Sequence, residues 1–218
     1  MKRSVMFALR VLIAMAAAAH GAGTLKPADA SWLPPRIVDH TVHVVLNNGF
    51  ARTEVIQTFQ NPNAHEIEAI YSFPLPTSAS LSEMTAMLGE TEICGEVLAK
   101  GKAEKAYREE RDSGNQAGLA GRNGSTDFEF RVAPLVANGQ AVVRFVYYQS
   151  LEIDTGTGRY LYPLEDGGTD DAAASFWTRN EQVDGPFQMD IELKSAWPVT
   201  GVRVPGFEAA TSTQEVGA

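Results

Sequence analysis

The sequence predicts a mainly β protein, an antiparallel β-sandwich with one amphipathic helix inserted among its strands. Many short segments alternate apolar with polar residues, which is the pattern of strands that bury one face. Stretches rich in Asn, Gly and Pro separate these segments. Only residues 100–114 carry a helical spacing instead. Short strands in this order favour a sandwich over a fold of alternating strands and helices.

The N-terminal segment is expected to direct export and not to belong to the fold. The positive residues that would form the n-region of a secretory signal peptide are Lys2, Arg3 and Arg10. The apolar run Val11–Ala19 is too short to span a bilayer. Cleavage after Ala19 and cleavage after Gly21 both fit the small residues there, so we assign residues 1–21 to the signal peptide. The mature chain is then expected to be secreted, periplasmic or on the cell surface.

Charge and cysteine content exclude several classes of function. The whole chain has 18 basic and 27 acidic residues; without the three basic residues of the signal segment the counts are 15 and 27, a formal charge of −12. Such a surface repels phosphate backbones and anionic lipid headgroups, so we expect neither nucleic acid binding nor direct membrane binding. Cys94 is the only cysteine, can form no internal disulfide, and is expected to be a small buried residue.

The first predicted hairpin follows a Pro-rich stretch, residues 22–37, which we interpret as an extended leader. In the run HTVHVVL, Val42, Val44 and Leu46 share one face. The residues NNG at 47–49 can take the positive φ that a tight hairpin turn needs. This turn leads into a second predicted strand, FARTEVIQTFQN.

The next strand, in the segment EAIYSFPLP, has one face predicted to be buried. The residues expected to enter the core are Ile67, Ala69, Tyr71 and Phe73. Pro74 and Pro76 have no N–H group to donate, so we expect them to end the ladder and direct the chain out of the sheet.

The remaining β-like segments are LSEMTAML, EICGEVLA, FEFRVAPL, QAVVRFVYYQSL, RYLYPL and PFQMDIELK. One stretch, KGKAEKAYREERDSG, is predicted to be an exposed amphipathic helix of about three turns. Ala103, Ala106 and Tyr107 have helical spacing, and Gly114 is placed to end the helix.

The order of these motifs resembles the vault protein inter-alpha-trypsin (VIT) domain of inter-alpha-trypsin inhibitor heavy chains and related proteins. The resemblance extends from about Val38 to Leu164. The matching motifs are N-G-x-A at Asn48–Ala51, T-E-V at Thr53–Val55, N-P at Asn61–Pro62, E-A-x-Y-x-F-P-L-P at Glu68–Pro76, G-E-V at Gly95–Val97 and K-A-x-K-A-Y at Lys102–Tyr107. Asn-Gly and Asn-Pro alone are common turn signals, so the specificity comes from finding six motifs in order.

The resemblance implies a domain without catalysis of its own that serves as a structural or protein-interaction module. Such domains usually precede a von Willebrand factor type A domain, whose metal-binding D-x-S-x-S run the sequence does not contain. We therefore expect the N-terminal part of a longer protein, with a solitary VIT protein as the alternative. Residues 38–166 are assigned to the VIT domain and residues 167–218 to a β-rich extension leading towards the downstream module.

An enzymatic alternative rests on the Asp-Thr-Gly run at Asp154–Gly156. Aspartic proteases use such a turn because its carboxylate shares a proton with a twin from a second lobe or subunit. This chain has one copy, so the alternative is an aspartic-type hydrolase acting as a homodimer through Asp154. The competing interpretation is a polar hairpin tip.

Two groups of possible metal ligands lack the spacing that a metal site needs. The acidic run Glu165–Asp171 lacks the ligand spacing of a calcium-binding EF-hand loop. His40 and His43 stand three residues apart in a predicted strand, so they point to opposite faces and cannot easily share zinc with each other or with His65. We predict no catalytic, cofactor-binding or metal-binding residue and no cofactor.

Overall fold

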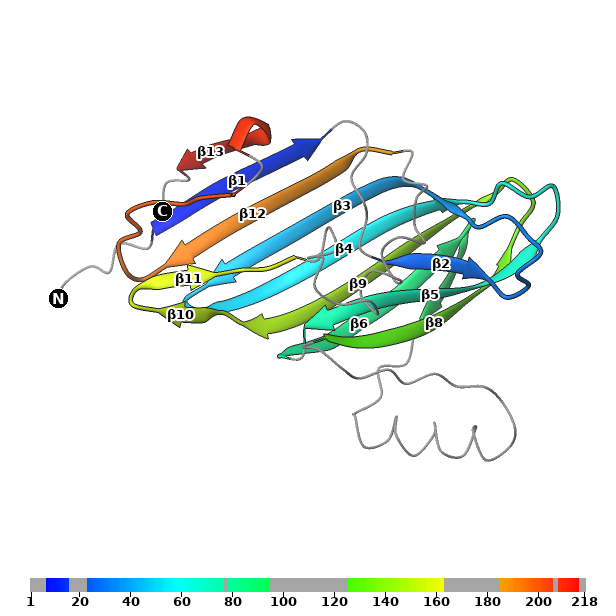
Figure 1. Cartoon of the computed structure of the whole chain (residues 1–218), viewed down its shortest axis with the longest axis horizontal. Helices are drawn as coiled ribbons and strands as arrows, with labels where there is room; N and C mark the ends of the chain where they lie inside the picture. Colours follow the sequence, from blue (N-terminus) through cyan, green and yellow to red (C-terminus); the bar gives the residue numbers. More distant parts are fainter. Residues whose placement is uncertain are drawn as a thin grey trace, which may run out of the picture.

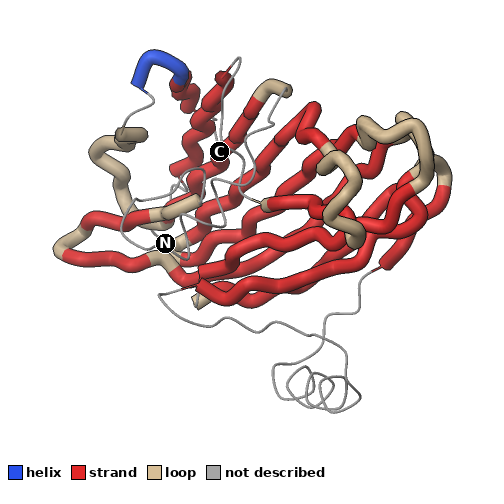
Figure 2. Tube along the Cα trace, turned by 45° about the vertical axis from the view of Figure 1, so that its right-hand side comes forward, coloured by secondary structure: helices blue, strands red, loops and turns tan. Residues whose placement is uncertain are grey.

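A computed structural model describes residues 7–15, 23–76, 78–94, 125–162, 185–205 and 208–215. Nearly all of these residues that belong to regular structure lie in strands, so the mainly β prediction is confirmed. A large sheet and a small sheet face each other, with a short hairpin beside them (Figure 1). The tube view shows the same arrangement of strands from a second direction (Figure 2).

The large sheet has eight strands, and all but one of its neighbouring pairs are antiparallel. Its spatial order is β13 (Thr211–Glu215), β1 (Phe7–Met15), β12 (Phe187–Ser195), β3 (Arg36–Asn47), β4 (Phe50–Gln60), β9 (Gln140–Ser150), β6 (Ala79–Leu88) and β7 (Thr91–Cys94). The parallel pair joins β12 to β3, with Phe187 opposite His40. This pairing makes the sheet mixed, which the sequence pattern did not indicate.

The small sheet has three antiparallel strands, β2 (Thr24–Pro27), β5 (Ile67–Pro76) and β8 (Ser125–Leu135). A bulge in β8 includes the cis peptide bond between Ala133 and Pro134. The hairpin consists of β10 (Glu152–Asp154) and β11 (Thr157–Arg159), and one 3₁₀ turn, η1, spans Glu208–Ala210. β2 lies within residues 22–37, the Pro-rich stretch that was expected to be an extended leader, and its Leu25 is buried.

The predicted hairpin at Asn47–Gly49 is confirmed. Asn48 has φ 47° and Gly49 has φ 91°, the pair of positive values that a two-residue hairpin turn needs. The strands on either side, β3 and β4, pair from Asn47 opposite Phe50 onward. Val42 and Val44 are buried as expected.

The core fills the space between the two sheets. The residues predicted from the EAIYSFPLP segment, Ile67, Ala69, Tyr71 and Phe73, are all at most 2% exposed. The rings of Phe73 and Tyr71 pack against rings of the large sheet. The distance between ring centroids is 4.4 Å for Phe73 and Phe145 and 5.8 Å for Tyr71 and Phe59. Edge-on and tilted aromatic pairs at these distances add to the hydrophobic stabilisation of the sandwich.

Pro74 does not end the strand, so the prediction is wrong for that residue, whereas β5 does end at Pro76. Pro74 and Pro76 remain paired in register with Asp127 and Ser125 of β8. The reason is the direction of their backbone groups. Glu68 accepts a hydrogen bond from Ala28 on the β2 side, and every second residue of a strand faces the same edge. The prolines therefore lack N–H groups on the edge facing β2, whose pairing with β5 stops at Ser72.

Other predictions have mixed outcomes. The run RYLYPL forms a strand only through Arg159; Tyr160 and Tyr162 instead turn towards the core. The predicted helix at residues 100–114 lies outside the described residues, as does the acidic run at 165–171. The N-terminal segment was expected to lie outside the fold, but its residues Phe7–Met15 form β1 of the large sheet. Its removal by cleavage stays a prediction. Within the described part of the chain, no helix has the length and hydropathy that crossing a membrane requires.

Candidate interaction surface

The Asp-Thr-Gly run forms the tip of the β10–β11 hairpin. Thr155 has φ 46° and Gly156 has φ 80°, so these residues make a tight turn between two short strands. Asp154 is exposed and stands opposite Thr157 in the hairpin. The sequence-based interpretation of this run as a polar turn is therefore the one that the geometry supports, and the aspartic-type hydrolase is not supported.

The histidines considered for zinc do not come together. His40 is buried in the interior, His43 lies on the opposite face of β3, and His65 is exposed with its ring 5.3 Å from that of Trp32. Among the described residues, no group of three His, Cys, Asp or Glu side chains could hold a metal ion. The side chain of Cys94 lies outside the described part.

His40 is a buried structural residue. Its Nε2 lies 2.8 Å from the hydroxyl of Tyr162, and its ring meets that of Phe187 edge-on at 5.1 Å between centroids. Burial lowers the pKa of His40 from 6.5 to about 3, because the charged imidazolium would lose its hydration. The ring is therefore neutral at physiological pH and serves packing between β3 and β12.

Two further polar contacts link segments that are distant in the sequence through the core. The hydroxyl of Tyr71 donates to Gln57 Oε1 at 2.6 Å, and those of Thr53 and Tyr160 lie 2.7 Å apart. Burial raises the pKa of Tyr71 and of Tyr160 well above the usual value. These hydroxyls are neutral hydrogen-bonding groups, and they give the core directional contacts in addition to apolar packing.

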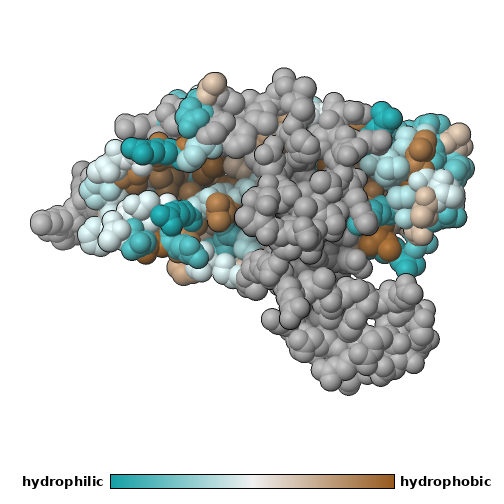
Figure 3. Space-filling model, viewed as in Figure 1, coloured by the Kyte–Doolittle hydropathy of each residue, from teal (hydrophilic) through white to brown (hydrophobic). Residues whose placement is uncertain are grey.

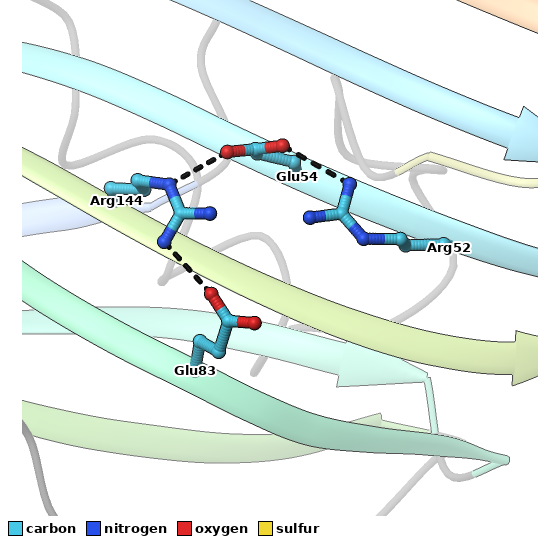
Figure 4. A network of polar contacts seen from close by, with 4 residues as sticks. All are labelled: Arg52, Glu54, Glu83 and Arg144. Carbon is cyan, nitrogen blue, oxygen red and sulfur yellow. Dashed lines mark hydrogen bonds and ion pairs between the residues drawn. The ribbon is translucent and has the colours of Figure 1, made fainter.

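The outer face of the large sheet carries an ordered charge network across β4, β9 and β6 (Figure 4). Arg144 Nε lies 2.6 Å from Glu54 Oε1, and Arg144 Nη1 lies 2.9 Å from Glu83 Oε2. Arg52 Nη1 approaches the second oxygen of Glu54 at 3.1 Å. Val146 stands opposite both glutamates in register, and its side chain is fully buried.

Electrostatics within this network favour the charged forms. Partial burial alone would raise the pKa of Glu54, but hydrogen bonds from Arg144 and Arg52, together with their charges, lower it below its usual value. The hydrogen bond to Glu83 raises the pKa of Arg144 further. The four groups thus form a connected arrangement of alternating charge on the sheet surface.

Large apolar side chains are exposed at one end of the large sheet and on the adjoining β10–β11 hairpin; we call Phe50, Tyr148, Ile153 and Trp197 the aromatic end. Trp197 is 78% and Phe50 67% exposed. Hydrogen bonds tie the three chain segments there together: Ala196 N donates to Asn48 Oδ1 at 2.8 Å, and Leu151 N donates to the carbonyl of Gly49 at 2.8 Å. Exposed aromatic residues held on a rigid frame are typical of protein–protein contacts.

Sequence reasoning did not find either surface. The alternation in FARTEV and VVRFV indicates that Arg52, Glu54 and Arg144 point away from the core. It cannot show that β9 lies between β4 and β6, which brings Glu83 to Arg144. The aromatic end likewise depends on three turns meeting at one end of the sheet.

These features define an all-β domain that offers surfaces for contact. The family model for the vault protein inter-alpha-trypsin domain matches residues 37–147. The chain belongs to the VIT family, as its motif order predicted.

Its relatives are long proteins of which it matches a small part. It is 25% identical over 170 residues to human protein mono-ADP-ribosyltransferase PARP4, covering 78% of this chain and 9% of that protein. It is 26% identical over 133 residues to a von Willebrand factor A domain-containing protein of Dictyostelium discoideum, covering 59% and 14%. With human inter-alpha-trypsin inhibitor heavy chain H6 the identity is 30% over 115 residues, covering 53% and 9%.

Proposed function

We propose that this chain is a non-catalytic, exported interaction module that docks through its aromatic end onto a von Willebrand factor type A domain. The observation that carries the proposal is the exposure of Phe50, Ile153 and Trp197 on chain segments that hydrogen bonds join at one end of the large sheet. Two Dictyostelium discoideum relatives named for von Willebrand factor A domains support this choice of partner. The signal-like N-terminus supports export.

The aromatic end combines large exposed apolar side chains with a hydrogen-bonded backbone. Aromatic side chains bury much apolar surface on contact, and they lose little entropy when their frame is already ordered. The charge network on the adjoining outer face contributes alternating charges that select a complementary partner surface. Tyr148, next to Arg52 across β4 and β9, connects the two surfaces.

No enzymatic role is part of the proposal. The mono-ADP-ribosyltransferase activity in the name of the human relative belongs to a protein of which this chain matches 9%. Asp154, the candidate catalytic residue from the sequence, is an exposed turn residue.

Site-specific photo-crosslinking in the source cells tests the docking. A photoreactive phenylalanine analogue at position 197 or 50 is expected to capture peptides from a type A domain, identified by mass spectrometry. The matched controls are positions 33 and 136, which are also exposed and apolar but lie near the other end of β4. Equal capture at all four positions, or capture without type A peptides, would contradict the proposal. Cell fractionation in the same experiment shows whether the chain is exported.

A further inference from the structure

β1 is a strand of the large sheet, yet it comes from the segment that is predicted to be cleaved off as a signal peptide. Phe7–Met15 lies between β12 and β13, pairing with nine residues of β12 and with five of β13. Both predicted cleavage sites, after Ala19 and after Gly21, follow the last residue of β1. Cleavage at either position therefore removes the whole strand and leaves the long edge of β12 without this neighbour.

The position that β1 occupies is apolar on the core side. Val11, at its centre, is 1% exposed and stands opposite Ile191 of β12. On the same face of β12, Phe187 and Met189 are buried, while Ile191 and Leu193 lie at the margin of the core. The space-filling view shows apolar residues along this part of the sheet (Figure 3). A strand in this position must therefore supply apolar residues at alternate positions.

The other face of β12 carries two acidic residues and one basic residue, Lys194. Asp190 and Glu192 follow the opposite parity on β12, and in register Glu192 stands opposite Arg10 of β1. Lys194 Nζ lies 3.1 Å from Glu192. A strand with a basic residue opposite Glu192 matches this face, because opposite charges on directly paired residues stabilise a sheet.

Two local candidates do not match the position. β13, with the sequence TSTQE, is polar on both faces and cannot cover Phe187 and Met189. A second copy of β12 in the same antiparallel register would place Asp190 opposite Glu192 of the other copy, and like charges in that position repel.

We propose that the place of β1 is a strand-binding site, and that in the exported chain an extended segment of a separate protein partner pairs antiparallel with β12. The partner segment has apolar residues at alternate positions and a basic residue opposite Glu192. The proposal rests on the export proposed above. Before cleavage the chain's own N-terminus fills the site; afterwards the nine-residue edge of β12 offers its backbone groups for β-augmentation.

The backbone direction of β12 provides a sharp test. His40 N donates to the carbonyl of Pro186, so the even-numbered residues of β12 face β3 and the odd-numbered ones face β1. Through the register, the amides of Leu9, Val11 and Ile13 then face β12, and that of Ala14 faces away. Ala14 also lies beyond the pairing with β13, which ends at Ile13.

The experiment uses the full chain exported and processed by its own N-terminus, with the cleavage established by intact mass. The probe is the peptide FALRVLIAM with a soluble Gly-Ser tail and a fluorophore, titrated by anisotropy. Saturable binding is expected. Methylation of the Ile13 amide should weaken it at least about tenfold, because it removes a donor and adds bulk at the ladder. Methylation of the Ala14 amide should change it less than about threefold.

A charge exchange tests the second face. Glu192→Arg in the chain should weaken binding of the parent peptide, and a peptide with Arg10→Glu should restore binding to this variant. Absence of saturable binding, equal effects of the two methylations, or a dimer of the processed chain that excludes the peptide would overturn the proposal. A processed chain that retains residues 7–15 would overturn it as well. Crosslinks at the aromatic end that persist in any of these cases would leave the proposed docking function standing.

Discussion

Tyr71 of the small sheet donates a 2.6 Å hydrogen bond to Gln57 of the large sheet in the centre of the core. Both residues are fully buried. Tyr71 lies on β5, the middle strand of the small sheet, and Gln57 lies on β4, one of the two middle strands of the large sheet. Directional contacts of this kind fix how two β-layers sit on each other, which apolar packing alone does less strictly.

Tyr71→Phe is expected to lower the free energy of unfolding by about 1–2 kcal/mol, because Gln57 loses this buried donor. Urea denaturation measures the change. Tyr148→Phe, at an exposed position, is the control and should have little effect. The double variant Tyr71→Phe with Gln57→Leu should be more stable than Tyr71→Phe alone; a further loss would show that the hydrogen bond is not the reason.

Gly23→Ala is expected to destabilise the domain by about 3 kcal/mol, from the cost of a left-handed backbone and from overpacking. Gly23 has φ 97°, and an added Cβ would lie 2.7 Å from the Tyr71 hydroxyl and 2.9 Å from Gln57 Oε1. Gly89 has φ 62° with nothing within 4 Å of an added Cβ. Gly89→Ala should therefore cost only about 1 kcal/mol. Thermal unfolding of both variants separates the effect of crowding from that of backbone strain. Equal losses of stability in the two variants would contradict a crowding effect at Gly23.

Glu54→Gln is expected to lower stability at pH 7 by about 0.5–1 kcal/mol, as for a partly exposed ion pair. Since the network lowers the pKa of Glu54 in the folded state, its contribution is present above the ordinary value of 4.5 and is lost as the pH falls through the lowered pKa. The difference between the two proteins should therefore vanish in acid. Glu68→Gln, which removes the more exposed pair with Arg131, is the control with the smaller effect.

His40 is expected to make the fold sensitive to acid. Its pKa is about 3 in the folded state against 6.5 ordinarily, so between these values the unfolded chain binds the extra proton and stability falls as the pH falls. The contribution reaches about 1.4 kcal/mol per pH unit. His40→Leu should flatten the dependence of unfolding free energy on pH between 6 and 4, whatever its effect at pH 7. An unchanged slope would show that His40 does not stay neutral. His65→Leu is the exposed control.

The local parts of this structure follow from the sequence and the long-range parts do not. Alternation in β5 identifies its buried face, and Asn48–Gly49 identifies a turn, because both depend on neighbours in the chain. The parallel pairing of β12 with β3 joins residues nearly 150 positions apart, and no local pattern carries it. The same holds for the charge network, since Glu83 and Arg144 meet only because β6 lies beside β9.

Tyr160 and Tyr162 show a different limit. Their alternation with Leu161 resembles a strand, and the spacing does place both tyrosines on one side. The two side chains nevertheless reach Thr53 and His40 from a segment without strand pairing. Period two reports burial on one side of an extended chain, and a ladder needs a partner in addition.

The two prolines of β5 have a consequence for solubility. Spaced two apart, Pro74 and Pro76 both withhold N–H groups from the same edge, while their pairing with β8 on the other side continues. A foreign strand arriving at that edge would find carbonyls without matching donors. The missing donors discourage edge-to-edge aggregation along the part of β5 that extends beyond its pairing with β2. The two prolines have this effect without carrying a charge.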